Sequence, residues 1–247
     1  MSQSRRFSKG AARRTRIERV KSTRLELLLA AEKLFAIHGM RGISLRQIVA
    51  ATRQRNLSTV HYHFGSRDAL VYAICDYRMP PIELDRARRI ARFAQAPPSR
   101  NRRVIELLRI LIEPSAQPIF ASRGHSYFRR LLLHCFVSEA DDIRGFISDR
   151  YDMGIRETAG LLRQALPQLS KAAFDIRWSL LIRSLTYLLA SMEMRAEQLP
   201  WRKAEVSLRR EISELAAAFS GFLGVPDRGG AADIRKGSSI RSKRRSE

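Results

Sequence analysis

Two histidines and a tyrosine, His61, Tyr62 and His63, stand side by side in the segment STVHYHFGSRDAL at residues 58–70. Such side chains could ligate a metal ion, act in acid–base catalysis, pack in a core or contact an anionic partner. On a helix, positions i and i+2 point apart, so His61 and His63 do not suit one shared metal ion. No cysteine or further histidine is close in sequence, and no arrangement of nucleophile, base and carboxylate is visible. We therefore predict no metal site, no catalytic residues and no cofactor.

The same segment has one apolar and one polar side when it is drawn as a helix. Leu57, Val60 and Phe64 recur at i, i+3 and i+7, so they share the inward face. His61 leans toward this face, where it is either a core histidine or a surface contact. The other side carries groups that donate to phosphate oxygens or base edges: Arg55, Asn56, Ser58, Thr59, Tyr62 and His63. The pattern favours a short helix lying against the edge of a nucleic-acid duplex.

Two further helices are expected before this segment. The first has apolar residues at spacings of three and four: Leu27, Leu28, Ala31, Leu34 and Phe35. The second begins at Ser44, which has capping-box spacing to Gln47. Arg46 falls on its exposed side, where it is either a phosphate contact or a solvated arginine. The polar turn TRQRN then completes a helix-turn-helix, whose second helix would enter the major groove.

The rest of the chain is predicted to be helical as well. Ser66 is a good N-cap for a fourth helix that should run to about Arg78, where Pro80 and Pro81 would break or kink it. Later helices are expected at roughly 82–95, 100–113, 125–138, 141–165, 170–197 and 202–223. The predicted fold is all-α, with a basic arm at 1–22, a helix-turn-helix domain at 23–79, a larger helical domain at 80–225 and a basic tail at 226–247.

The charge of the chain indicates an anionic partner. The 247 residues include 46 Lys and Arg against 24 Asp and Glu, a net charge of +22. Nucleic acid and an anionic membrane surface are both candidates, and arginine enrichment by genome composition is the plainer explanation. The charge is uneven, however, since residues 1–24 hold nine basic residues and one acidic residue, a net +8. Both ends are poor in large apolar residues, so we expect them to be disordered when free.

Other features indicate a cytoplasmic protein. Cys75 and Cys135 lie far apart in apolar stretches and are expected to be buried thiols. The first residues contain no apolar run typical of a secretory signal. The most apolar later run, WSLLIRSLTYLLASM, is short and contains Arg183, so no membrane-spanning segment is predicted.

Residues 27–71 resemble the DNA-binding domain of the tetracycline-repressor (TetR/AcrR) family of transcription regulators. The matching features are the apolar pair, Ala-Ala and Leu-Phe of residues 27–35, then Gly39, Ser44, Ile48, Thr59-Val60, His63-Phe64 and Ser66-Arg67-Asp68-Ala69-Leu70. The turn before the third helix is one residue longer than is common in the family. The family's phosphate-contacting tyrosine therefore aligns with His61, whereas the helical wheel favours Tyr62. Arg67 stands where the family has a backbone-contacting lysine.

The resemblance implies a homodimer that binds a palindromic operator in double-stranded DNA and a C-terminal domain that binds a small-molecule effector. The predicted DNA contacts are Ser44, Arg46, Arg55, Asn56, Ser58, Thr59, Tyr62, His63 and Arg67. Aromatic and apolar residues at helical spacing are candidates for a mostly apolar pocket, or for plain core: Phe128, Leu132, Phe136, Phe146, Tyr151, Trp178 and Tyr187. Apolar stripes on the last two helices suit a dimer interface or an internal core: Leu181, Leu185, Leu188, Ile212, Leu215 and Phe219.

Two other classes of protein stay open from the sequence. One is an enzyme on a helical scaffold, which a co-purifying cofactor or metal would reveal. The other is a basic protein that coats nucleic acid or an anionic surface through its N-terminal arm, without preference for an operator. Both explain the ordered motif in residues 27–70 less well than a regulator does.

Overall fold

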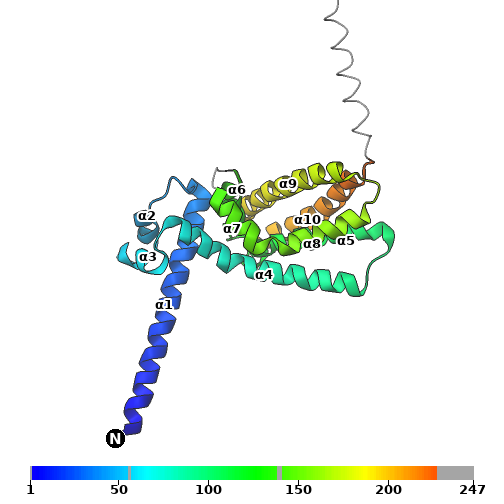
Figure 1. Ribbon diagram of the computed structural model, residues 1–247. Coiled ribbons are helices and arrows are strands. Elements are labelled where there is room, and N and C mark those ends of the chain that lie inside the picture. The colour runs from blue at the N-terminus through cyan, green and yellow to red at the C-terminus, as the bar shows by residue number, and fades with distance from the viewer. Residues whose placement is uncertain (1, 55–56, 138–140, 227–247) are drawn as a thin grey trace, which may run out of the picture.

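The computed structural model describes residues 2–54, 57–137 and 141–226, and these residues form helices and no strand. The all-α prediction is therefore confirmed. The helices are α1 (Ser2–His38), α2 (Leu45–Ala50), α3 (Leu57–Phe64), α4 (Arg67–Gln95), α5 (Arg100–Ala121), α6 (Phe128–Val137), α7 (Asp141–Tyr151), α8 (Met153–Ala165), α9 (Lys171–Glu197) and α10 (Trp201–Gly224). Figure 1 shows α2 and α3 beside α1 at one end, and α4 leading to a bundle of α5, α8, α9 and α10. Within the described ranges, no helix is long and apolar enough to cross a membrane.

The helices enclose two hydrophobic cores. The first joins the helix-turn-helix to two later helices, since Phe35 of α1 and Ile48 of α2 share it with Phe128 of α6 and Ile147 of α7. The second holds α5, α8, α9 and α10 together, with Leu107, Leu162, Leu185 and Leu208 among its buried residues. The predicted inward residues of the first helix are buried there, including Leu27, Leu28 and Phe35. Helices α6 and α7 therefore form one packing unit with the N-terminal helices.

Proline does not end helices where the sequence predicted it would. Helix α4 continues through Pro80 and Pro81 to Gln95, and α5 continues through Pro114 and Pro118 to Ala121. Each proline removes one backbone donor from its helix. In α5 both prolines are buried, so packing offsets the lost hydrogen bonds. The expected boundary at residues 79 and 80 consequently lies inside a continuous helix.

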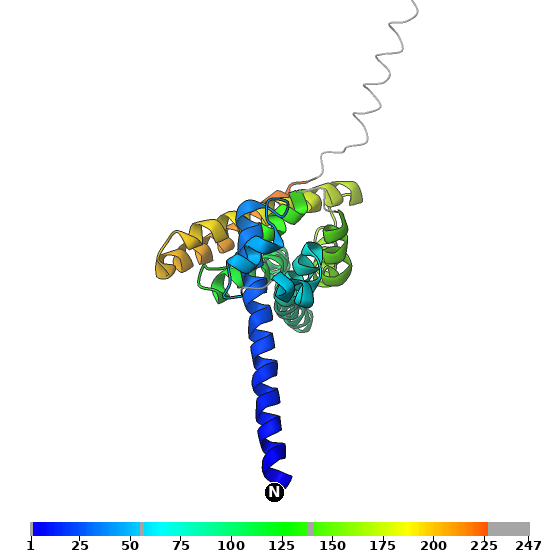
Figure 2. The ribbon, with the colours of Figure 1, turned by 90° about the vertical axis from the view of Figure 1, so that its left-hand side faces the viewer.

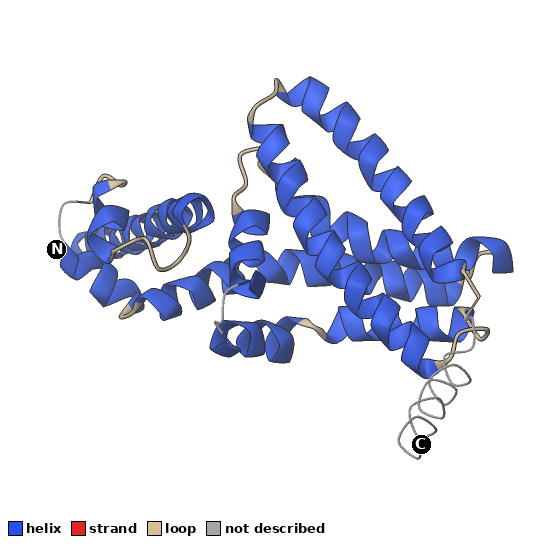
Figure 3. Ribbon diagram, turned by 90° about the horizontal axis from the view of Figure 1, so that it is seen from above, coloured by secondary structure: helices blue, strands red, loops and turns tan. Residues whose placement is uncertain are grey.

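The N-terminal arm also differs from the prediction. Residues 1–22 were expected to be disordered, but α1 begins at Ser2 and runs without a break to His38. Residues 2–38 contain no proline and are rich in Arg, Lys, Ala, Leu and Glu, which have high helix propensity. Figure 2 shows the first half of α1 projecting away from the rest of the molecule, and Figure 3 shows helices joined by short loops.

Candidate nucleic-acid interface

The third helix has the apolar underside and exposed outer side that its sequence predicts. Val60 is fully buried in the first core, and Phe64 packs against that core. Tyr62 is 81% exposed, and Ser58 is exposed as well. The tyrosine ring lies edge-on to the half-buried ring of His63, with ring centroids 5.2 Å apart. A phenol and an imidazole thus lie side by side on a helix whose apolar side packs against the first core.

Arg24 of α1 adds positive charge beside this helix. Its guanidinium carbon lies 5.1 Å from the centroid of the Phe64 ring, a cation–π contact. Partial burial, followed by the nearby charge of Arg24, lowers the pKa of His63 below its usual value of 6.5. His63 is therefore mainly neutral at neutral pH, while Arg24 supplies the charge. The helix-wheel argument for α3 did not identify Arg24, because it lies more than 30 residues away on another helix.

The second helix begins with a complete capping box. The Gln47 backbone N–H donates to the Ser44 hydroxyl at 3.3 Å, and the Gln47 side-chain oxygen accepts from the Ser44 N–H at 2.8 Å. Ser44 was predicted as a DNA contact, and the hydroxyl also donates to Gln47 Oε1 at 2.8 Å. Arg46 is exposed on the same helix, as predicted.

The enlarged turn between α2 and α3 is attached to the first helix by Glu26. Its carboxylate accepts from the Arg53 backbone N–H at 2.8 Å and from the Gln54 side-chain amide at 3.3 Å. The Thr52 hydroxyl donates to the Val49 carbonyl at 2.8 Å and closes the end of α2. Sequence reasoning missed Glu26, because its partners lie 27 and 28 residues further along the chain. Glu26 therefore fixes the turn that leads into α3, and it is not itself a predicted DNA contact.

The remaining predicted DNA residues fall in different situations. Arg55 and Asn56 lie outside the described residues. Thr59 and His61 lie on α3, but their side chains lie outside the described part, so the choice between His61 and Tyr62 is not tested. Arg67 is exposed, yet one of its guanidinium nitrogens donates to the Met40 carbonyl at 3.1 Å. Arg67 therefore helps to join α4 to the turn after α1.

The seven predicted pocket residues do not form one cavity. Phe128, Leu132, Phe146 and Tyr151 belong to the first core, where Phe146 stacks on Tyr72 with ring centroids 4.3 Å apart. Trp178 packs in the second core, while Phe136 and Tyr187 are 41% and 61% exposed. Helical spacing identified apolar side chains but not which of two cores each would join, and these seven residues are divided between the two cores and the surface. Among the described residues, no group of three or more potential ligands could hold a metal ion.

Most of the predicted dimer residues pack against the chain's own core. Leu181, Leu185 and Ile212 are at most 6% exposed inside one chain. Leu188, Leu215 and Phe219 are half-buried, and the last two pack against the second core. The strongest apolar stripe on each helix is used by the chain's own core, which leaves a weaker stripe outside. On α9 that outer stripe consists of Ile176, Leu180, Tyr187 and Met194, which are 46–63% exposed.

Comparisons with known proteins match part of the chain to one family model and most of the chain to solved structures. Residues 109–221 match the family model described as the tetracyclin repressor-like C-terminal domain. None of the curated proteins matches the chain. Native NalD, the secondary repressor of the MexAB-OprM multidrug efflux pump in Pseudomonas aeruginosa, shares the fold with a TM-score of 0.51 and 19% identity, over 85% of this chain and all of that one. A TetR-family transcriptional regulator from Mesorhizobium loti gives a TM-score of 0.49 and 14% identity, over 83% and 98% of the two chains. The family model covers 113 of the 247 residues, so the match shows a tetracyclin repressor-like domain in the C-terminal part of the chain, and the fold as a whole is shared with NalD.

Proposed function

We propose that this protein is a homodimeric, sequence-specific DNA-binding regulator of the cytoplasm that represses transcription until a small-molecule effector releases it, and that it is not an enzyme. The observation that carries the proposal is the third helix. Its buried Val60 holds it on the first core, while Tyr62 is 81% exposed on the outside with Ser58 and His63 nearby. Hydroxyl, phenol and imidazole groups are suited to phosphate oxygens and base edges.

The charge distribution supports DNA as the partner. Arg24 and Arg46 are exposed on the two helices that flank α3, and the N-terminal part of α1 adds a net +8 over residues 1–24. Figure 1 shows this part of α1 running on past α3. A basic helix in that place would lie beside the same duplex and add affinity that does not depend on sequence.

The outer stripe of α9 supports a dimer. Ile176, Leu180, Tyr187 and Met194 recur at spacings of four and seven, so they share one face of the helix. A row of large exposed apolar side chains on one helix is typical of an interface. On α10, the exposed residues Ala217, Ala218 and Gly221 are small and would allow a partner's helices to approach closely. Two copies of the α9–α10 hairpin would then form a four-helix interface.

The proposal is tested by selecting the bound sequence from a random duplex library with the full chain. An inverted repeat should emerge, and it should bind more tightly than a scrambled duplex of equal length and composition. Typical discrimination for specific regulators is about 10³-fold or more. Replacing Ser58, Tyr62 or His63 should weaken binding to the repeat without unfolding the chain. Equal binding of repeat and scrambled duplex would favour the alternative, a basic protein that coats nucleic acid or an anionic surface without operator specificity.

A further inference from the structure

Two arginines are buried inside the C-terminal half of the protein. Arg86 of α4 is 1% exposed and Arg129 of α6 is 8% exposed. Arginine is rarely buried to this extent unless its guanidinium group is paired. Neither residue was singled out by the sequence, because each lies in an arginine-rich stretch of an amphipathic helix.

The hydrogen-bonding needs of these arginines are only partly met. Arg86 donates to the carboxylate of Glu83 and, at 2.9 Å, to the Ser115 hydroxyl, but its Nε atom has no partner. Arg129 has neither Nε nor Nη2 satisfied, and it forms no ion pair with any described residue. Three buried donors from two guanidinium groups are therefore without an acceptor within the described chain. Such groups are rare in native proteins and point to a bound water, ion or ligand.

Both arginines keep their charge at neutral pH. Burial lowers the pKa of Arg129 to about 10, the nearby Glu193 opposes this effect, and the positive charge of Arg86 adds to it. Burial also lowers the pKa of Arg86, with Glu83 acting in the opposite direction. A pKa of about 10 still leaves the group protonated at pH 7. The two guanidinium groups are near enough to repel each other, and the carboxylates of Glu83 and Glu193 offset part of this repulsion.

We propose that Arg129 and Arg86 bind the carboxylate group of a small organic acid, and that this acid is the effector. The inference rests on the proposed function, whose effector it assigns to a chemical class. A guanidinium group presents parallel donors that match a carboxylate. Arg86 already pairs with Glu83, and Arg130 pairs with both Glu193 and Glu197, so Arg129 is the one of these three arginines without an ion pair among the described residues. Its unpaired Nε and Nη2 donors match the two oxygens of one carboxylate.

The surrounding helices fix these donors in place. Gly154 of α8 lies against Arg86, where a Cβ atom would come within 3.0 Å of Arg86 Cδ and 2.8 Å of a Glu83 oxygen. The Ser115 hydroxyl that accepts from Arg86 donates in turn to the Leu111 carbonyl at 2.8 Å. The site is therefore assembled from α4, α5, α6 and α8 before any ligand arrives.

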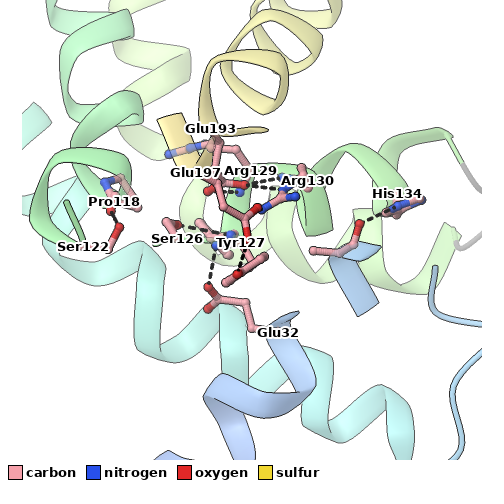
Figure 4. Close-up of polar contacts among 12 residues, drawn as sticks. Glu32, Pro118, Ser122, Ser126, Tyr127, Arg129, Arg130, His134, Glu193 and Glu197 are labelled. Atoms are coloured by element: carbon pink, nitrogen blue, oxygen red, sulfur yellow. Dashed lines mark hydrogen bonds and ion pairs between the residues drawn. The ribbon is translucent and has the colours of Figure 1, made fainter. Parts of the chain in front are cut away.

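The position of Arg129 connects such a site to the DNA-binding helices. Arg129 lies in the first turn of α6, and the backbone N–H groups of Arg129 and Arg130 donate to Glu193 of α9 at 3.1 and 3.0 Å (Figure 4). Further along α6, Leu131, Leu132 and Cys135 pack in the same core as α1. A ligand that pulls on Arg129 would therefore act on a helix held between the dimer helix α9 and the DNA-binding core.

The test is calorimetric titration of the full chain, without DNA, using benzoate and octanoate as probes. Their uncharged analogues benzamide and octanol serve as matched ligands. At least one carboxylate should give saturable binding that its uncharged analogue lacks. Arg129→Met should weaken this binding about 10-fold or more, the effect of losing a hydrogen bond to a charged group. Arg88→Met is the control, because Arg88 is exposed on the same helix as Arg86 and its loss should leave binding unchanged.

The outcomes separate this inference from the proposed function. Absence of carboxylate binding by the wild-type chain, or equal binding by Arg129→Met, would overturn the inference and leave hydration of the guanidinium groups as the explanation. Operator binding is measured separately and could persist in that case. If Arg129→Met does not fold, Arg86→Met and Arg129→Lys replace it, since each removes part of the donor set. A bound carboxylate that also releases operator DNA would support both proposals.

Discussion

At the scale of single residues, Tyr62 offers a clean test of the recognition face. Its side chain is 81% exposed and makes only an edge contact with His63. Tyr62→Phe should therefore leave the melting temperature unchanged and weaken binding of operator and scrambled DNA by a similar factor. Loss of one hydrogen bond of about 1 kcal/mol corresponds to about fivefold. Fluorescence anisotropy with labelled duplexes measures both affinities.

Tyr77 provides the matched control for this change. It is 44% exposed on α4, away from α3, and Tyr77→Phe should bind DNA like the wild type. If Tyr62→Phe also binds like the wild type, the Tyr62 hydroxyl does not contact the duplex, and His61 becomes the stronger candidate for that contact.

His63 should make DNA binding depend on pH. Burial and Arg24 lower its pKa in the free protein, whereas a neighbouring phosphate favours the protonated ring. Binding then takes up a proton, so operator affinity should rise as the pH falls from about 7.5 to 5.5, by no more than about tenfold per pH unit. His63→Gln should abolish this dependence on pH, and the same slope in that variant would contradict the assignment.

Because the unfolded chain binds the proton more readily than the folded chain, the contribution of His63 to folding stability should fall as the pH falls below about 6.5.

Predictions for single residues were correct where the helical periodicity alone determines which side of a helix a residue faces. Val60 inward and Tyr62 outward follow from the helical wheel of a short amphipathic segment. Arg24, Glu26 and Arg129 were missed because their roles depend on contacts across 27 to 64 residues of chain. Periodicity within one helix carries no information about such partners.

At the scale of helices, the main error of the sequence prediction concerned proline. Pro80 and Pro81 predicted a domain boundary, yet α4 spans both and joins the two cores. The helical spacing of apolar residues continues on both sides of the two prolines, and Met79 and Ile82 are both buried. Tertiary packing of this stripe outweighs the local cost of the missing donors. A continuous α4 also means that the bundle and the DNA-binding helices share a rigid element.

The outer stripe of α9 gives a prediction at the same scale. Leu180→Glu and Tyr187→Glu place a charge on a face that we propose is buried in the dimer. Each variant should shift the mass in solution, measured by light scattering after gel filtration, toward that of one 28.3 kDa chain. Operator affinity should fall as well, because two linked half-sites are no longer bound together.

A surface leucine elsewhere supplies the comparison for these variants. Leu84 is 52% exposed on α4, so Leu84→Glu adds the same charge at a different exposed apolar residue. It should leave the dimer intact. A wild-type mass for Leu180→Glu and Tyr187→Glu, or a monomeric wild type, would place the interface elsewhere or remove it.

At the scale of the whole molecule, one buried ion pair and a series of hydrogen bonds connect the N-terminal helices to the bundle. Glu32 of α1 is 1% exposed and accepts two hydrogen bonds from Arg78 of α4, at 2.7 and 3.0 Å. It also accepts from the Tyr127 backbone N–H at 3.2 Å, and Tyr127 donates its hydroxyl to Glu197 of α9 at 2.5 Å (Figure 4). The chain of contacts thus runs from α1 through the start of α6 to α9.

Removing Glu32 should destabilise the whole chain. Glu32→Ala leaves the guanidinium group of Arg78 and a buried N–H without their acceptor, which costs about 3–5 kcal/mol. For a chain of this size that corresponds to a fall of about 6–20 °C in melting temperature. Glu214→Ala, at an exposed site on α10, should change it little. A small effect of Glu32→Ala in calorimetry would mean that water replaces the carboxylate and that this connection is weak.

The basic extension of α1 determines how much of the affinity is independent of sequence. Deleting residues 2–21 removes eight basic residues and one acidic residue, and leaves the apolar face that starts at Leu27. If the whole protein neutralises about 6–10 phosphates, its affinity should fall roughly 10³–10⁵-fold between 50 and 200 mM salt. The truncated chain should show a shallower salt dependence and weaker binding to every duplex, but the same ratio of operator to scrambled affinity.

Truncation of residues 227–247, which removes a net charge of +4, controls for charge alone. Loss of the operator preference on deleting residues 2–21 would instead assign sequence recognition to the arm and not to α3.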